Sequence, residues 1–406
     1  MSSFVFVNQA YHPDPVATAQ LLDDLCQTLA GRGHQVTVVA GDRGYDSPIE
    51  RYTLRQRSGG VDVRRIPYVS LGKGGRTKRA VSFASFHARL LPALLALPAA
   101  DVAVALTSPP LVGATVAAAA RIKRMKLAQW VMDLNPDEAV AAGWLREGGL
   151  LERVLHRSVR DSYIRSQRIV VLDTDMRTRL TERYGVSSER IAVIPPWDPG
   201  GLAEDNAGAD LFRRIQGLTD KYVVMYSGNH SPCHPLGTLL EAARQLRQRE
   251  DIVFCFIGGG SGVAEVARFV RTHGTTNILQ LPYQPIESLS ASLSAADLHA
   301  VVMGTSFVGI VHPSKIYGIL AVRRPFVLIG PDRCAIGDMV RDQGIGHRVD
   351  PADAAGLAAY IRSRADQGRT TLERSDPRVD AIKDRYDRSK QLSCWTELLE
   401  RIVKGE

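Results

Sequence analysis

The fold of this chain is decided by the stretch FVFVNQAYHPDPVATAQLLDDLCQTLAGRGHQVTVVAG, residues 4–41. Residues 3–8 form an apolar run typical of a buried strand, and residues 19–30 repeat leucine at helical spacing. Residues 35–40 are again apolar and β-branched, so this stretch predicts a strand, a loop, a helix and a second strand. Units of this kind build parallel sheets, and we expect a Rossmann-like α/β domain.

The same alternation continues along the 406 residues and predicts two domains. Prolines and glycines at residues 195–201 form the best linker candidate. We predict an α/β protein in which two Rossmann-like domains, residues 1–195 and 196–378, face a central cleft, and in which a helix at 379–404 returns to the first domain. Further strands are expected at residues 61–66, 102–106, 127–132, 168–172, 191–194, 222–226, 252–257, 278–281, 298–302 and 326–329.

The net charge of +8 is placed unevenly. Residues 1–195 hold 26 of the 51 basic and 18 of the 43 acidic residues, so the whole excess lies in the first half. Basic runs at 51–65, 73–79 and 121–126 suit an anionic membrane surface, and solvated loops and helix faces are the alternative for any single run. No nucleic-acid recognition motif accompanies them, so we expect no nucleic-acid partner.

Cysteine spacing and hydropathy set further limits. The five cysteines show no CxxC spacing, which argues against a disulfide framework and a zinc site. Residues 1–7 lack a basic segment and a cleavage site, so we expect no secretory signal and a cytoplasmic location. The most apolar stretch, residues 90–104, contains prolines and is shorter than the roughly 20 residues of a spanning helix, so no transmembrane helix is expected.

Short motifs occur in a characteristic order along the chain. They are YHPDPVATAQ from Tyr11, TSPPL from Thr107, VMDLNPD from Val131, RIAVIPPW from Arg190, YSGNHS from Tyr226, FIGGG from Phe256, LPYQP from Leu281 and HPSKIYGILAVRRP from His312. In this order the chain resembles the retaining family-4 glycosyltransferases, and within them bacterial polysaccharide and O-antigen enzymes such as colanic-acid fucosyltransferases.

The resemblance implies the GT-B fold and transfer of a sugar from a nucleoside-diphosphate donor, with UDP slightly favoured over GDP. It implies a polyprenyl-linked or other lipid-linked glycan as acceptor, a peripheral position on the cytoplasmic face of the membrane, and no metal or other cofactor. A nucleotide-sugar epimerase of the same architecture and a noncatalytic sugar-nucleotide-binding scaffold are the alternatives.

Donor contacts are expected in the second domain. Lys315 is the best candidate for the phosphates, with Ser314 capping the helix that follows, and a surface lysine is the alternative. Tyr283 is available for stacking on the base, against the alternative of a buried tyrosine in a packed loop. The expected donor-binding residues are Gly228, Asn229, His234, Gly259, Pro282, Tyr283, Gln284, Ser314 and Lys315.

The sequence departs from better-known members of the family at two places. Their two glutamates, of which the second holds the ribose, align approximately with Ile310 and Gly318. Their Arg and Lys pair after the glycine turn aligns with about Asn229 and His234. These differences indicate either a divergent subgroup in which Lys315 takes over the charge or an inactive relative, and we favour the subgroup.

The first domain is expected to carry the acceptor side. The loop from His12 to Thr18 follows the first strand, and Asp133 follows a later one, where it can orient or deprotonate an acceptor hydroxyl. Helix capping is the competing explanation for Asp133, as for Asp137 and Glu138. The catalytic candidates are therefore Asp133 and Lys315. A helix at residues 82–97 beside the basic run at 73–79 suits an interfacial surface or packing on the sheet.

Overall fold

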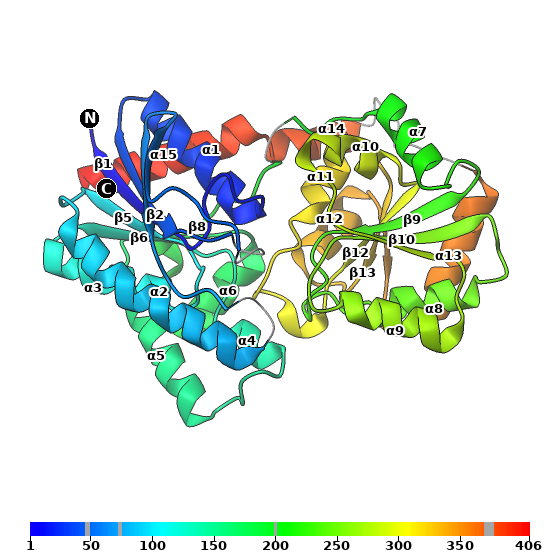
Figure 1. Ribbon diagram of the computed structural model, residues 1–406, viewed down its shortest axis with the longest axis horizontal. Helices are drawn as coiled ribbons and strands as arrows, with labels where there is room; N and C mark the ends of the chain where they lie inside the picture. The colour runs from blue at the N-terminus through cyan, green and yellow to red at the C-terminus, as the bar shows by residue number, and fades with distance from the viewer. Residues whose placement is uncertain (45–48, 72–74, 199–200, 369–376) are drawn as a thin grey trace. The chain divides into compact units, whose positions relative to one another are not determined.

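The computed structural model describes residues 1–44, 49–71, 75–198, 201–368 and 377–406. The chain divides into two compact α/β units (Figure 1). The first comprises Met1–Pro199, Gly309–His312 and Arg388–Glu406, and the second comprises Gly200–Val308 and Pro313–Asp387. The expected linker residues 199 and 200 lie outside the described residues. The short segment Gly309–His312 differs from our predicted boundaries, because its backbone pairs with the first unit.

The first unit contains an eight-stranded sheet of order β3-β4-β2-β1-β5-β6-β7-β8, in which only the β3-β4 pair is antiparallel. Because β1 pairs with both β2 and β5, the direction in which strands are added reverses there, and such a switch point is where α/β sheets bind ligands. The strands are β1 Ser3–Val7, β2 Gln35–Gly41, β3 Arg55–Ser58, β4 Val61–Ile66, β5 Val102–Ala105, β6 Lys126–Trp130, β7 Arg168–Val171 and β8 Ile191–Val193.

Helices cover both faces of this sheet (Figure 1). Phe86, Leu90 and Leu94 of α2 are buried in a core cluster with strand residues, so the apolar side of this helix packs on the sheet instead of forming an interfacial surface. The helices are α1 Ala17–Gly31, α2 Arg76–Ala96, α3 Val112–Lys123, α4 Asp137–Ala141, α5 Leu150–Arg165, α6 Thr174–Tyr184, η1 Ser188–Arg190 and α15 Arg388–Lys404.

The second unit contains a six-stranded parallel sheet of order β11-β10-β9-β12-β13-β14. Its switch point lies at β9, between β10 and β12. The strands are β9 Tyr222–Ser227, β10 Ile252–Ile257, β11 Ile278–Leu281, β12 Leu298–Val302, β13 Phe326–Ile329 and β14 His347–Val349. The helices are α7 Asn206–Ile215, α8 Gly237–Gln245, α9 Val263–His273, η2 Ile286–Ser288, α10 Leu289–Ser294, η3 Thr305–Phe307, α11 Lys315–Ala321, α12 Ala335–Gln343, α13 Ala354–Asp366 and α14 Pro377–Arg385.

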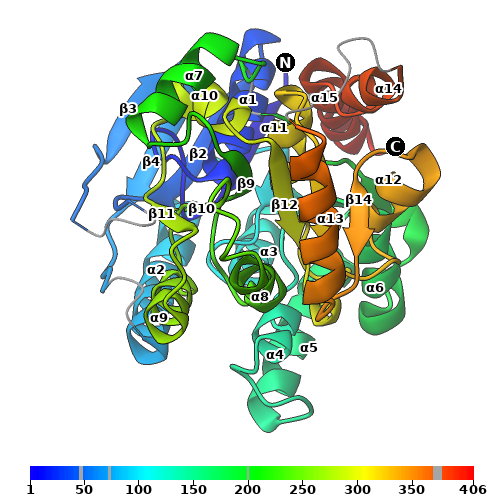
Figure 2. The same ribbon diagram turned by 90° about the vertical axis from the view of Figure 1, so that its right-hand side faces the viewer.

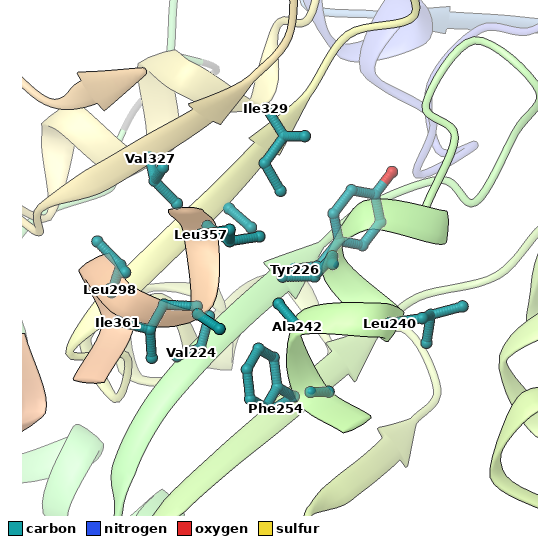
Figure 3. Packing of buried hydrophobic residues seen from close by; sticks show 14 of the residues in the cluster. Val224, Tyr226, Leu240, Ala242, Phe254, Leu298, Val327, Ile329, Leu357 and Ile361 are labelled. Atoms are coloured by element: carbon teal, nitrogen blue, oxygen red, sulfur yellow. The ribbon is translucent and has the colours of Figure 1, made fainter. Parts of the chain in front are cut away.

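The two faces of this second sheet carry separate cores, because successive side chains of a strand point to opposite faces. Val224 and Phe254 pack with residues of α8 and α13 on one face, as Figure 3 shows. Figure 2 shows these two helices on the same face of the sheet. Val223 and Cys255 pack with Phe212 of α7 on the other. Figure 3 also shows Tyr226 at the margin of the first cluster, and this residue recurs in the site below.

The carboxyl-terminal segment forms two helices where we expected one over 379–404. The helix α14 belongs to the second unit, where Tyr386 packs on Tyr317 of α11 with ring centroids 4.9 Å apart. The helix α15 belongs to the first unit, where Trp395 packs on Trp130 with ring centroids 4.5 Å apart. Each half buries its apolar face in a different core, and this requires the break between them.

We expect Trp395→Ala to lower the free energy of unfolding of the first unit by about 3–5 kcal/mol, because the indole is fully buried and leaves a cavity. Calorimetric unfolding of the full chain measures the change. Cys394→Ala is the matched control, since this neighbouring side chain is exposed. Equal melting temperatures for the two variants would contradict the packing of α15.

Two further expectations concern the cysteines and membrane-spanning helices. Cys26, Cys233, Cys255 and Cys334 are buried and Cys394 is exposed, all five with free thiols. Among the described residues, no helix has the length and apolarity that crossing a bilayer requires.

Candidate active site

Lys315 begins α11, and its ammonium group occupies an unusual environment. The Nζ atom lies 3.6 Å from the ring centroid of Tyr226, in a cation–π contact. This nitrogen is buried and has no hydrogen-bond partner among the described residues, so the alternative of a surface lysine is wrong. Burial lowers the pKa of Lys315 to about 7. A buried ammonium without an acceptor is costly, so this position is suited to an anionic ligand.

Gly228 brings backbone next to this ammonium. A Cβ atom built on Gly228 would lie 3.5 Å from the Lys315 Nζ, and the residue has a φ of +131°. On the other side, a Cβ on Gly258 would collide with the Gly228 carbonyl oxygen. The turns after β9 and β10 therefore approach at a distance that only glycine permits. They leave open backbone beside the lysine, at the switch point of the sheet.

The residues after Gly228 hold the two turns together. Asn229 is exposed, and its side-chain oxygen lies so close to Gly260 that a Cβ there would collide with it. The His230 amide donates to the carbonyl of Gly259 at 2.7 Å. Asn229 thus lies on the rim of the turn, while the buried His230 is structural.

His234 is the second predicted residue beside the lysine. Burial, and then the charge of Lys315, lower its pKa to about 3, so the ring is neutral at physiological pH. Its Nδ1 lies 2.7 Å from the Val302 carbonyl oxygen, which can only accept, so Nδ1 carries the proton. His234 therefore cannot supply the positive charge of the Arg and Lys pair of the family, which leaves that role to Lys315.

The segment expected at the base lies beside the glycine turn. Tyr283 is 52% exposed, and a Cβ on Gly259 would meet its ring at 2.7 Å. Its ring is therefore accessible for stacking, and the alternative of a buried tyrosine is wrong. Pro282 is exposed, and the Gln284 side-chain amide donates to the Pro282 carbonyl at 2.9 Å, which stabilises the turn.

Ser314 does not act as predicted. It occupies the N-cap position of α11, but its side chain makes no capping hydrogen bond and is exposed. Its backbone already has helical dihedral angles, φ −59° and ψ −17°, whereas a capping side chain requires an extended residue.

In the first unit, Asp133 follows β6 and is partly buried. It forms an isolated antiparallel bridge with Val311, and the next amide, of Leu134, donates to the Ile310 carbonyl at 2.9 Å. Burial, and then the negative charge of Glu138, raise the pKa of Asp133 to about 7. A carboxyl group with this pKa exchanges protons readily at neutral pH, which suits a general base. The capping explanation fails, because α4 begins with Pro136 as its N-cap.

Asp137 and Glu138 have other roles. Asp137 is buried and forms ion pairs with Arg179 and Arg183 at 2.7 Å and 2.9 Å, so it is a structural residue. Glu138 accepts a hydrogen bond from Asn135 at 3.1 Å and acts electrostatically on Asp133.

The acceptor-side loop leaves β1 at the switch point of the first sheet. His12 is exposed, and its carbonyl accepts a hydrogen bond from the buried Arg65 at 2.5 Å. Thr18 lies in the first turn of α1 instead of the loop, and is partly buried. The structure thus brings together Lys315, Gly228 and His234 in one unit, and holds Asp133, His12 and Thr18 in the other.

The sequence analysis did not identify two residues that contribute to the site. Tyr226 supports Lys315 through its ring, and Arg65 fixes the loop at His12. Tyr226 lies inside the YSGNHS motif, so its position was the available signal. Its contact with Lys315, which lies 89 residues later in the chain, could be recognised only from the structure.

Comparison with known proteins indicates the family and the fold of the chain. Residues 18–197 match the family described as "Glycosyl transferase 4-like domain". A relative named as a colanic acid biosynthesis glycosyl transferase, WcaI of Escherichia coli K12, is 24% identical over 365 residues, covering 87% of this chain and 89% of the relative. Glycosyltransferase WbjE of Pseudomonas aeruginosa is 25% identical over 57% of this chain and 59% of its own.

Among solved structures, HepE of Anabaena in complex with UDP-glucose aligns with a TM-score of 0.73 at 14% identity, over 98% of this chain and all of that one. WaaG, a glycosyltransferase involved in lipopolysaccharide biosynthesis, aligns with a TM-score of 0.69 at 16% identity, over 99% of this chain and all of that one. The fold is that of the GT-B glycosyltransferases. The match over residues 18–197 and the named relatives support a family-4 glycosyltransferase, and the chain is an enzyme of the glycosyltransferase class.

Proposed function

We propose that the enzyme transfers a sugar, with retention, from a nucleoside-diphosphate donor to a lipid-linked glycan in cell-surface polysaccharide biosynthesis. The observation that carries the proposal is the buried ammonium of Lys315, which lacks an acceptor among the described residues and lies beside the open backbone of Gly228. A donor diphosphate supplies the missing negative charge. UDP is preferred over GDP, since HepE was crystallised with UDP-glucose.

The proposed reaction depends on two charged groups, Lys315 of the second unit and Asp133 of the first. The bond from the anomeric carbon to the β-phosphate oxygen breaks, and the diphosphate leaves with the electron pair. The acceptor hydroxyl oxygen then bonds to the short-lived oxocarbenium-like carbon from the face that the diphosphate leaves, so the configuration is retained. Lys315 stabilises the charge that grows on the departing phosphate. Asp133, as its carboxylate, takes the hydroxyl proton. The scheme requires no metal ion, other cofactor or protein nucleophile.

The two positions that align with the glutamate pair of the family have apolar surroundings. A Cβ on Gly318 of α11 would contact Leu202 and Leu293 at 3.4 Å, and Ile310 is buried. In the proposed donor complex the ribose must therefore be held by other groups. The relatives are named glycosyltransferases, so the epimerase and scaffold alternatives are not favoured.

We expect Tyr283→Ala to weaken binding of the nucleoside diphosphate by about 1–3 kcal/mol, because stacking of a base on an aromatic ring contributes that amount. Tyr283→Phe keeps the ring and is expected to bind normally. Isothermal titration with UDP and GDP measures both variants. Equal affinities for the alanine variant and the unchanged protein would exclude this ring as the platform for the base.

The proposal is tested first by thermal shift of the purified chain with UDP, GDP, dTDP, CMP and their sugars, because a ligand of the folded state raises its melting temperature. Selective stabilisation by one nucleoside diphosphate identifies the base. The matching nucleotide sugar is then incubated with lipid-linked glycans, and the anomeric configuration of the product is read by NMR. Stabilisation without transfer to any acceptor supports the scaffold alternative.

A further inference from the structure

The segment Gly309–His312 belongs to the first unit, although the residues before and after it belong to the second. It is bonded to the loop that follows β6. Val311 forms the antiparallel bridge with Asp133, and the Ile310 carbonyl accepts a hydrogen bond from the Leu134 amide at 2.9 Å. The backbone of this segment is therefore fixed beside the proposed general base.

The side chain of His312 adds a second attachment, at the end of β7. Its Nδ1 atom lies 2.8 Å from Oδ2 of Asp173, and the two side chains are only 3% and 8% exposed. A carboxylate can only accept, so Nδ1 carries the proton. Oδ1 of Asp173 accepts a hydrogen bond from the Met176 amide at 2.8 Å and caps α6. One carboxylate thus joins His312 to the start of α6.

The same segment leads directly into Lys315. Only Pro313 and Ser314 stand between His312 and the lysine, and the fixed φ of proline leaves the start of α11 little freedom relative to His312. Ser314 does not cap this helix, and α11 has only seven residues. A short helix without a side-chain cap takes its position from the groups that hold its ends. The position of Lys315 therefore depends on His312 as well as on Tyr226.

Stability alone does not require a histidine and a carboxylate at this place. Two buried ionisable groups must be taken from water, and apolar side chains of similar volume are often equally stabilising. Asp173 can also cap α6 without His312, since a cap needs only an oxygen near the Met176 amide. What the bond to His312 adds is direction, because a charge-assisted hydrogen bond fixes a side chain more narrowly than apolar packing does.

We propose that His312 and Asp173 form a positioning pair, which holds the entry to α11 so that Lys315 and Asp133 act together on the bond between sugar and phosphate. Neither member of the pair contacts a substrate in this proposal. The inference rests on the proposed function for the reaction that benefits, whereas the fixing of the entry to α11 is a property of the chain without substrate.

The test compares His312→Leu with His312→Asn. Leucine fills the buried position without a donor, while the amide nitrogen of asparagine is as many bonds from Cβ as Nδ1 and can donate to Asp173. We expect His312→Leu to lower kcat about 10- to 100-fold, because a small displacement of a catalytic group has an effect of this size. We expect His312→Asn, which keeps the hydrogen bond, to stay within about threefold of the unchanged enzyme.

The affinity of His312→Leu for the nucleoside diphosphate is expected to change by no more than about threefold, because a group that acts only on the transition state affects kcat and not binding. The contact of Lys315 with Tyr226 and the glycine turn at Gly228 lie within the second unit and are kept. This separation of kcat from affinity distinguishes the positioning role from Lys315→Met, which removes the charge itself.

His34→Leu is the matched control. His34 forms a histidine–carboxylate pair in the same unit, with its Nε2 3.3 Å from Oε1 of Glu400, and its side chain is 11% exposed. It precedes β2, so it lies at the opposite edge of the sheet from the strand ends that carry Asp133 and Asp173. The control is expected to lower the melting temperature and to leave the kcat of the folded enzyme unchanged.

The coupling within the pair is measured with Asp173→Asn, which keeps an oxygen to cap α6, and with the double variant that also carries His312→Leu. We expect the double variant to be no slower than His312→Leu alone, since both changes remove the same bond. Additive losses, or equal kcat for His312→Leu and His34→Leu, would overturn the positioning pair.

Hydrogen exchange of the peptide 309–321, measured by mass spectrometry without substrate, separates this inference from the proposed function. We expect exchange about tenfold faster in His312→Leu than in the unchanged chain, and no acceleration in His34→Leu. If sugar is transferred and His312→Leu leaves both kcat and exchange unchanged, this inference alone is contradicted. If exchange accelerates as expected but the unchanged chain transfers no sugar, the proposed function alone is contradicted.

Discussion

Lys315→Met is expected to lower kcat/KM by on the order of 100-fold, because it removes a charged contact to the phosphates that contributes about 3 kcal/mol. Methionine keeps the length of the side chain and its packing on Tyr226. The stabilisation of the variant by the preferred nucleoside diphosphate is expected to be lost together with most of the activity. Lys221→Met is the matched control, since the Lys221 Nζ donates to the Glu250 carbonyl at an exposed position. A Lys315→Met variant that binds nucleotide as tightly as the unchanged protein would exclude Lys315 from the donor site.

The same variant is expected to make the ligand-free protein more stable below pH 7. The pKa of Lys315 falls from about 10.5 to about 7 on folding, so the folded state disfavours the proton that the unfolded state keeps. This penalty is complete below pH 7 and disappears as the pH rises toward 10.5. Urea unfolding of both proteins at pH 6 and pH 10 measures it. An equal difference in stability at the two pH values would show that the lysine carries no such penalty.

Asp133→Asn is expected to lower kcat by about 10²- to 10⁴-fold, the usual contribution of a general base, while the affinity for nucleotide stays unchanged. Asparagine preserves the shape of the side chain and the backbone bridge to Val311. Single-turnover rates and nucleotide titrations separate the two effects. If affinity and rate fell together, the role of Asp133 would be structural.

The pH profile follows from the same two groups. Asp133 must be ionised and Lys315 must be charged, and both have a pKa of about 7 in the free enzyme. The profile of kcat/KM is therefore expected to be a narrow bell with its maximum near pH 7. Glu138→Gln removes a charge that raises the pKa of Asp133, so the acid limb is expected to move to lower pH. A flat profile between pH 6 and pH 8 would exclude this pair.

Most of the sheet architecture was predictable, because buried parallel strands are continuous apolar runs. The strand β3 was not, since Arg55–Ser58 is polar and is held at the edge by its pairing with β4. The break between α14 and α15 was also missed, because helical spacing does not reveal that the two halves face different cores.

The candidate site was predictable only as a set of residues. Motif order placed Lys315 after a strand and Gly228 at the end of another, but the contact with Tyr226 depends on the pairing of β9 with β12. The capping role of Ser314 failed, because dihedral angles at a short helix are set by its surroundings. The sequence allowed an interfacial surface at α2, but its apolar residues Phe86, Leu90 and Leu94 are buried in the core.

The course of the backbone affects how hybrid enzymes can be built. The first unit is formed by Gly309–His312 and Arg388–Glu406 together with the beginning of the chain. A hybrid that joins two relatives at a single junction near the linker would therefore leave two foreign segments in the first unit, while the second unit would come from one parent. A hybrid that exchanges the second unit should keep the partners of Asp133 and Trp130 from the parent of the first, which calls for four junctions instead of one.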